Sequence, residues 1–153
     1  MDPTARSAED RMLEIFVGEW NNTGTVSPGP FGPGGAVTGR SNYYWDVGGK
    51  WLLYVSQLEL PGLGAYEVQG GVAFNSRAGK YDAYAINNLG SLLVYDGEWT
   101  DKETLIFTLV HPQAGTARVI YEKLPADSLK MISQKVAEDG NFVSYFETDF
   151  VRA

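Results

Sequence analysis

The sequence contains no cysteine and only one histidine, His111, among its 153 residues. Without cysteine the chain has no disulfide, no thiolate nucleophile and no thiolate ligands for zinc or an iron–sulfur cluster. A single imidazole also excludes a multi-histidine metal site. His111 precedes Pro112 in an expected turn, where we interpret it as a surface residue. We therefore expect no metal and no cofactor.

Positive charge and long apolar runs are scarce as well. Lys and Arg number 12 against 19 Asp and Glu, which gives a formal net charge of -7 at pH 7. An acidic chain of this size lacks the positive field that binds nucleic acid or an anionic membrane. No segment approaches the roughly 20 apolar residues of a membrane span, and the first residues show no signal-peptide pattern. We expect no nucleic-acid partner, no membrane partner and a cytoplasmic location.

Glycine and aromatic residues, in contrast, are abundant. The chain has 18 Gly, 9 Tyr, 7 Phe and 4 Trp. Turns favour glycine and strands favour aromatic residues, so this composition is typical of a protein rich in β-structure. The length corresponds to one domain, residues 1–153, with enough chain to bury a core.

The sequence pattern predicts one helix followed by strands. Ser7 is the expected N-cap of a helix over 7–17, which carries an apolar face. From Glu19 onward the apolar residues recur with period two. All seven prolines fall outside the expected strands. We predict a hairpin over 37–60 and further strands near 19–27, 65–74, 80–87, 91–99, 103–110, 116–124, 128–136 and 142–152.

The hairpin over 37–60 is the best-defined unit. Gly48-Gly49 is typical of a two-residue turn with positive φ at both positions. Counting back from this turn pairs Tyr43 with Tyr54 and directs both inward, together with Trp45. The neighbouring Asp46 then points outward.

Short turns between successive strands favour an up-and-down order that closes on itself. We therefore predict an all-β fold, an up-and-down antiparallel barrel of about ten strands over 19–152, preceded by the short helix. Closure makes the first strand the antiparallel neighbour of the last, which brings Trp20 close to Val151 and Arg152. The Arg152 guanidinium then covers the Trp20 indole, or Arg152 is a frayed terminal residue in water. Arg118 is the alternative partner of the indole.

Two further features concern the surface. Residues 28–35 are almost entirely proline and glycine, with Phe31 the only large side chain. This segment is either a simple solvent-exposed loop or a flap over one end of the barrel, with Phe31 reaching toward the opening. Tyr44 and Trp51 form an outward aromatic strip that is a candidate contact of a homodimer.

Several of these segments carry a resemblance to a known family. They are the N-terminal helix, Gly-Glu-Trp at 18–20, the Pro- and Gly-rich segment 25–35 and Trp-Asp-Val-Gly-Gly-Lys-Trp at 45–51. Over nearly its whole length the chain resembles the bacterial family DUF1579, and its Gly-x-Trp start is similar to that of calycins such as lipocalins, fatty-acid-binding proteins and nitrobindins. The resemblance implies a calycin-like closed barrel in a family of unassigned function, with no catalytic residue to carry over. Nitrobindin-like proteins bind haem through a histidine near the C-terminal end of the barrel. The last strand here has none, which leaves only tyrosine ligation for a haem.

We expect the barrel to bind a small apolar or aromatic molecule, because a closed barrel of this size holds one such ligand. The argument rests on strand 65–74. If Leu60 pairs with Ala65, then Glu67 and Gln69 share the inward face with the hairpin aromatics. The candidate ligand-binding residues are Tyr43, Trp45, Tyr54, Glu67, Gln69 and Tyr84. A register shifted by one residue instead places inside, as ordinary packing, Tyr66, Val68, Val72 and Phe74.

The alternative function is a cofactor-free enzyme. In this hypothesis a buried carboxylate with tyrosine or arginine partners acts on a small phenolic or carbonyl substrate. The candidates are Glu147 with Asp149 on one strand face, and Glu67 with Tyr43 and Tyr54. A buried carboxyl group with a raised pKa favours the enzyme, whereas an interior without one favours binding.

Overall fold

The computed structural model describes residues 6–30 and 32–153. The chain begins with α1 (Ala8–Met12), which continues as a short 3-10 helix, η1 (Leu13–Phe16). The Ser7 hydroxyl accepts a hydrogen bond from the Asp10 N–H at 3.1 Å, and the Ser7 N–H donates to the Asp10 carboxylate at 2.9 Å. This reciprocal capping box satisfies two N–H groups at the start of α1. The helix predicted over 7–17 thus starts at its expected cap, and its second half tightens to 3-10 geometry.

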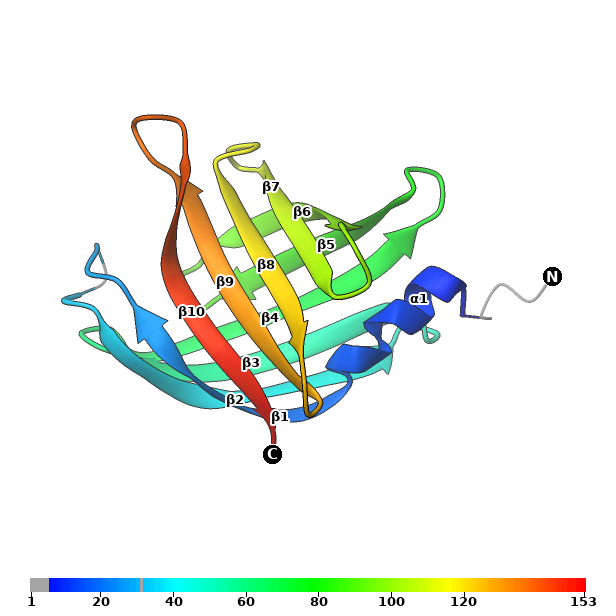
Figure 1. The fold of residues 1–153 in the computed structure, drawn as a ribbon, viewed down its shortest axis with the longest axis horizontal. Helices are drawn as coiled ribbons and strands as arrows, with labels where there is room; N and C mark the ends of the chain where they lie inside the picture. The colour runs from blue at the N-terminus through cyan, green and yellow to red at the C-terminus, as the bar shows by residue number, and fades with distance from the viewer. Residues whose placement is uncertain (1–5, 31) are drawn as a thin grey trace.

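Ten antiparallel strands follow and close into a barrel in sequence order, with the first strand beside the last (Figure 1). This confirms the all-β, up-and-down barrel and places the helical segment at one end of it. The strand bounds lie within two residues of the predicted ranges. They are β1 (Gly18–Val26), β2 (Gly35–Asp46), β3 (Trp51–Leu60), β4 (Gly64–Asn75), β5 (Lys80–Asn87), β6 (Leu92–Trp99), β7 (Thr104–His111), β8 (Ala117–Leu124), β9 (Ser128–Val136) and β10 (Phe142–Arg152).

The hairpin of β2 and β3 has the predicted register. Tyr43 pairs with Tyr54, and both lie on the inward face, whereas Asp46 is exposed. Gly48 and Gly49 adopt φ values of +69° and +76°, a backbone conformation that residues other than glycine rarely adopt. The turn chemistry therefore sets the register, and the register decides which aromatic residues enter the lumen.

The register of β3 with β4 corrects one expectation. Leu60 pairs with Gly64 and not with Ala65, so the connection is one residue shorter than the interpretation that placed Glu67 and Gln69 inside. A shift of one residue turns every side chain of a strand to the other face. Glu67 and Gln69 are consequently exposed on the outside of the barrel. The residues of β4 that face the lumen are those of the alternative register, Tyr66, Val68, Val72 and Phe74.

The pairing of β1 with β10 closes the barrel as predicted, with Trp20 opposite Arg152. The Arg152 guanidinium carbon lies 3.7 Å from the centre of the Trp20 ring, and the indole is fully buried. The first interpretation of Arg152 is therefore confirmed, since a frayed side chain would not cover a buried ring. Arg118, the alternative partner, instead lies 3.9 Å from the ring centre of Phe142.

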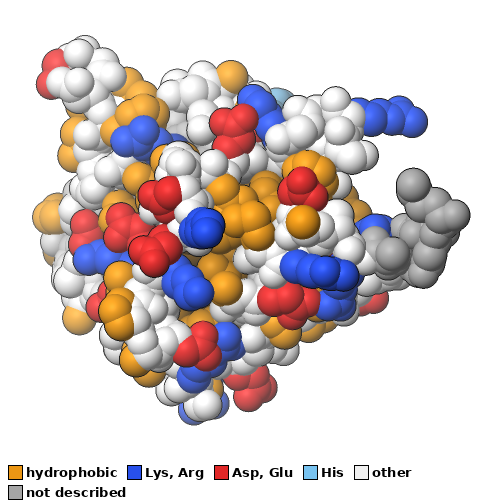
Figure 2. Space-filling view, turned by 45° about the vertical axis from the view of Figure 1, so that its right-hand side comes forward, with side chains coloured by type: hydrophobic (Ala, Val, Ile, Leu, Met, Phe, Trp, Pro, Cys, Tyr) orange, Lys and Arg blue, Asp and Glu red, His pale blue; other side chains and the backbone are white. Residues whose placement is uncertain are grey.

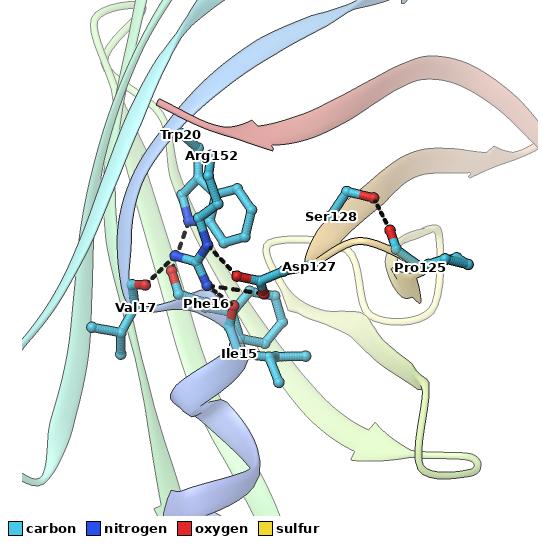
Figure 3. Close-up of polar contacts among 8 residues, drawn as sticks. All are labelled: Ile15, Phe16, Val17, Trp20, Pro125, Asp127, Ser128 and Arg152. Carbon is cyan, nitrogen blue, oxygen red and sulfur yellow. Dashed lines mark hydrogen bonds and ion pairs between the residues drawn. The ribbon is translucent and has the colours of Figure 1, made fainter.

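Arg152 also ties the helical segment to the barrel (Figure 3). Its Nη2 donates to the Ile15 carbonyl at 3.1 Å, and its Nη1 donates to the Val17 carbonyl. Its Nε lies 3.0 Å from the Asp127 carboxylate in the β8–β9 turn. These contacts join the helical segment, the last strand and the β8–β9 turn at one end of the barrel, which we call the closed end.

The surface mixes charges of both signs on the face shown in Figure 2, where acidic and basic side chains alternate with apolar ones. Among the helices in the described residues, none is long and apolar enough to cross a membrane. Phe31, the expected tip of a flap, lies outside the described residues. Gly32, next to it, packs against the β3–β4 turn, so this loop adjoins that turn.

Candidate functional site

A cavity of about 50 Å³ lies inside the barrel, against the helical segment. Its wall combines two residues of η1 with residues from strands β2 to β8. Tyrosine hydroxyls are the only polar side-chain groups in this lining, so no lining side chain carries a charge at neutral pH. The described residues that line it are Leu13, Phe16, Tyr43, Leu52, Tyr54, Val72, Ala83, Tyr84, Tyr95, Phe107, Val119 and Tyr121.

Aromatic rings in contact with one another form much of the wall. The rings of Tyr43 and Tyr54 stack at 5.0 Å between centroids with an interplanar angle of 21°. Phe16 stacks on Tyr43 at 5.9 Å and meets Tyr121 edge-on at 5.2 Å. Tyr121 also meets Phe107 edge-on at 5.9 Å. An aromatic ligand would pack against these rings in the same two geometries, stacked or edge-to-face.

Glycines on neighbouring strands make room for these rings. A Cβ atom at Gly70 would lie 2.5 Å from the Tyr54 hydroxyl oxygen, so only glycine leaves the Tyr54 ring its place. A Cβ atom at Gly97 would likewise lie 2.5 Å from Cε1 of Phe107. Large aromatic residues opposite glycine therefore shape the lumen.

Burial raises the pKa of the tyrosines in the wall. The pKa values of Tyr43 and Tyr54 are well above the ordinary value, first because burial disfavours the phenolate and second because Tyr121 lies beside them. The pKa of Tyr121 is raised by burial too, with a hydrogen bond from Tyr43 opposing the shift. All three phenols are thus protonated at neutral pH. The Tyr43 hydroxyl donates to Tyr121, and the hydroxyls of Tyr54 and Tyr121 can donate hydrogen bonds inside an apolar site.

The helical segment closes the cavity at one end and is fixed by side chains of the barrel. Phe16 is 3% exposed. The Tyr81 hydroxyl donates to the Glu9 carbonyl at 2.6 Å, and the Trp45 indole N–H donates to the Glu14 carboxylate at 3.1 Å. Together with the Arg152 contacts, these hydrogen bonds hold the helical segment across the closed end of the barrel.

Three of the predicted ligand-binding residues lie on the inward face, at different depths. Tyr43 and Tyr54 line the cavity. Trp45 also faces inward, as expected, but it lies half-buried at the closed end against Glu14 and is not part of the cavity wall. A role for these residues in ligand binding remains a prediction.

The other three predicted residues belong to the outward-facing positions of their strands. Tyr84 pairs with Gly71 and its ring lies 6.0 Å from that of Trp51, yet it is among the residues that line the cavity. Glu67 and Gln69 are exposed on the outer face, because the β3–β4 register differs by one residue. Neither can contact a ligand in the lumen.

The carboxylates proposed for the enzyme hypothesis lie outside the lumen. Glu147 and Asp149 alternate along β10 with buried residues, and Glu147 lies 4.0 Å from Lys130. Within residues 6–30 and 32–153 the one buried carboxylate is that of Asp10, which caps α1. In the same residues no group of three His, Cys, Asp or Glu could hold a metal. His111 is exposed at the end of β7.

Sequence reasoning missed three important wall residues, Phe16, Tyr95 and Tyr121. Phe16 was assigned to the helix but not to the cavity, because nothing local shows how far a short helix enters a barrel. Tyr121 follows Val119 with period two, and Tyr95 lies opposite Ala83. The period-two pattern places each of them on one face of its strand, but the register across the intervening turns decides which face points inward.

Comparison with known proteins bears on the fold. A family model described as "Protein of unknown function (DUF1579)" matches residues 5–152. The crystal structure of Rv2717c from M. tuberculosis is similar at a TM-score of 0.67, with 15% sequence identity over 97% of this chain and 99% of that chain. The structure of EF1p2_mFAP2b bound to DFHBI matches at a TM-score of 0.46, with 9% identity over 94% and 98% of the chains. No curated protein matches the chain. At its low identity, the likeness to Rv2717c shows a shared fold.

Proposed function

We propose that this chain, which belongs to the DUF1579 family of proteins of unknown function, binds a small apolar or aromatic molecule inside its barrel. The observation that supports the proposal is the cavity walled by Tyr43, Tyr54 and Tyr121. An ordinary hydrophobic core is close-packed and has few voids larger than a water molecule. Here stacked aromatic rings border open space in the interior of the barrel.

The lining indicates which ligands fit. Because no lining side chain is charged, a ligand with a buried charge would lose its hydration without gaining an ion pair. The protonated phenols of Tyr54 and Tyr121 can donate to an ether, carbonyl or hydroxyl oxygen, whereas the Tyr43 hydroxyl already donates to Tyr121. The aromatic walls favour a flat ring between them. An uncharged aromatic molecule with one or two oxygen atoms satisfies all three conditions.

The size of the cavity adds a constraint. Its volume of about 50 Å³ exceeds what a single water molecule needs. A drug-sized ligand occupies a pocket of about 300–1,000 Å³, so such a molecule requires more room than the lumen offers in this conformation. The ligand is therefore small, or it binds as the tyrosine side chains move apart.

Two experiments test the proposal. Native mass spectrometry of protein purified without denaturation shows whether a small molecule accompanies the chain. Fluorescence titration with the uncharged probe N-phenyl-1-naphthylamine then measures binding directly. We expect saturable binding with one site per chain.

Ala83→Val tests where the probe binds. Ala83 is buried and lines the cavity, so the two added methyl groups occupy the space and should weaken probe binding about tenfold, equivalent to about 1.4 kcal/mol. Ala73→Val is the matched control, because Ala73 pairs with Asp82 on the outward face and should leave affinity unchanged. Equal affinities for wild type and Ala83→Val would contradict a site in the lumen.

A further inference from the structure

The end of the barrel opposite the helical segment, which we call the open end, also carries inward-facing tyrosines. Tyr95 lines the cavity, whereas Tyr66 faces the lumen from β4 near the β3–β4 turn and is not part of the cavity wall. The Tyr66 hydroxyl accepts a hydrogen bond from Asn87 Nδ2 at 3.2 Å. Inward-facing tyrosines therefore extend beyond the cavity.

A bulge in β10 adds one more tyrosine at the open end. Ser144 pairs with Gln134, and Phe146 pairs with Ser133, so Tyr145 is an extra residue between the two pairs. Such a bulge re-aims the side chain of the extra residue. Tyr145 interacts with Ser133, which is buried on the inward face of β9, and it is 37% exposed. It thus lies at the mouth of the lumen.

The two ends of the barrel differ in how firmly they are closed. At the closed end Phe16 of the helical segment is 3% exposed and Trp20 is fully buried. Arg152 covers the Trp20 ring and is hydrogen-bonded to the helical segment. At the open end Tyr145 is partly in solvent. Rotating one partly exposed side chain on a bulge disturbs far fewer buried contacts than undocking the helical segment.

We infer that the ligand enters the barrel past Tyr145, and that Tyr66, Tyr95 and Tyr145 form the outer part of its binding path. This inference rests on the proposed function and specifies the ligand further. A path bordered by three phenols suits an elongated flat molecule better than a compact one. The Lys135 ammonium lies 5.7 Å from the centre of the Tyr145 ring, so the mouth offers a cation to a polar outer end of the ligand.

Stopped-flow fluorescence with N-phenyl-1-naphthylamine tests the entrance. Removing the ring in Tyr145→Ala should raise both the association and the dissociation rate constants about fivefold. This factor corresponds to lowering the activation barrier for entry and exit by about 1 kcal/mol. Tyr145→Trp should lower both. Tyr44→Ala is the matched control, because Tyr44 is a similarly exposed tyrosine (38%) on the outward face of β2 and should leave the rates unchanged.

A variant at the other end distinguishes the two routes. Arg152→Met weakens the attachment of the helical segment at the closed end without changing a residue of the cavity wall, and it should leave the rate constants within about twofold of wild type. Faster binding in Arg152→Met together with unchanged rates in Tyr145→Ala would overturn the inferred entrance. If the probe binds wild type and Ala83→Val weakens it, such a result leaves the proposed function intact. Absence of probe binding to wild type would instead overturn the proposed function and the entrance together.

Discussion

Arg152→Met is the perturbation for which the structure makes the sharpest stability prediction. Methionine retains much of the apolar stem of arginine but removes the guanidinium. The variant loses the contact over Trp20 and the donors to the carbonyls of Ile15 and Val17. It also loses the ion pair with the exposed Asp127.

The magnitude follows from these contacts. A desolvated cation over an indole contributes about 0.5–2 kcal/mol. Hydrogen bonds from a charged donor contribute about 1.5–3 kcal/mol each when they are buried. The Arg152 side chain is one-third exposed and its contacts are not independent, so we expect a loss of about 3 kcal/mol. With a urea m-value of about 2 kcal/mol/M, the unfolding midpoint should fall by about 1.5 M.

Urea unfolding followed by tryptophan fluorescence and far-ultraviolet circular dichroism measures the change. Asp127→Asn is the matched control: it removes only the exposed partner and should shift the midpoint far less. Arg152→Lys retains the charge but loses the planar guanidinium group with its several donors, and its unfolding midpoint should lie between those of wild type and Arg152→Met. A midpoint for Arg152→Met equal to wild type, or equal losses in Arg152→Met and Asp127→Asn, would refute the account of the closed end.

Two other predictions concern pH and packing. Tyr43 and Tyr54 have raised pKa values in the folded state, so above about pH 10 the unfolded chain loses protons that the folded chain keeps. Each of the two groups then lowers the free energy of unfolding by about 1.4 kcal/mol per pH unit. Their tyrosinate absorbance should therefore appear only as the circular dichroism of the barrel is lost, and titration of every tyrosine in the folded protein would argue against burial. Trp45→Ala should cost about 2–4 kcal/mol in urea unfolding, since Trp45 is half-buried beneath the helical segment. Tyr44→Ala, one residue away on the outer face, should cost about 0.5 kcal/mol, and equal losses would contradict the facing of β2.

Much of the fold is encoded locally and could be predicted from the sequence. Gly48-Gly49 specifies the turn, the turn specifies the register of β2 with β3, and the register places Tyr43 and Tyr54 inside. Closure also follows from simple topology, which is why the pairing of Trp20 with Arg152 was predictable.

The candidate site was less predictable, because two determinants are not local. The β3–β4 connection contains Pro61 and Gly62 and is followed by Gly64, a sequence that is compatible with more than one loop length. In the structure Gly64 already pairs with Leu60, and this turns Glu67 outward. The cavity also depends on how deeply Phe16 enters the barrel, and no residue pattern in a short helix reports that depth.

Binding inside the lumen is the central claim, and contacts between the probe and assigned tyrosine rings test it most directly. Nuclear Overhauser effects from bound N-phenyl-1-naphthylamine to isotope-labelled tyrosines, assigned with single Tyr→Phe variants, report which rings the probe contacts. Our account predicts contacts to Tyr43, Tyr54 and Tyr121, and none to Tyr44 on the outer face. Contacts to Tyr44, with none to Tyr43, Tyr54 or Tyr121, would contradict it.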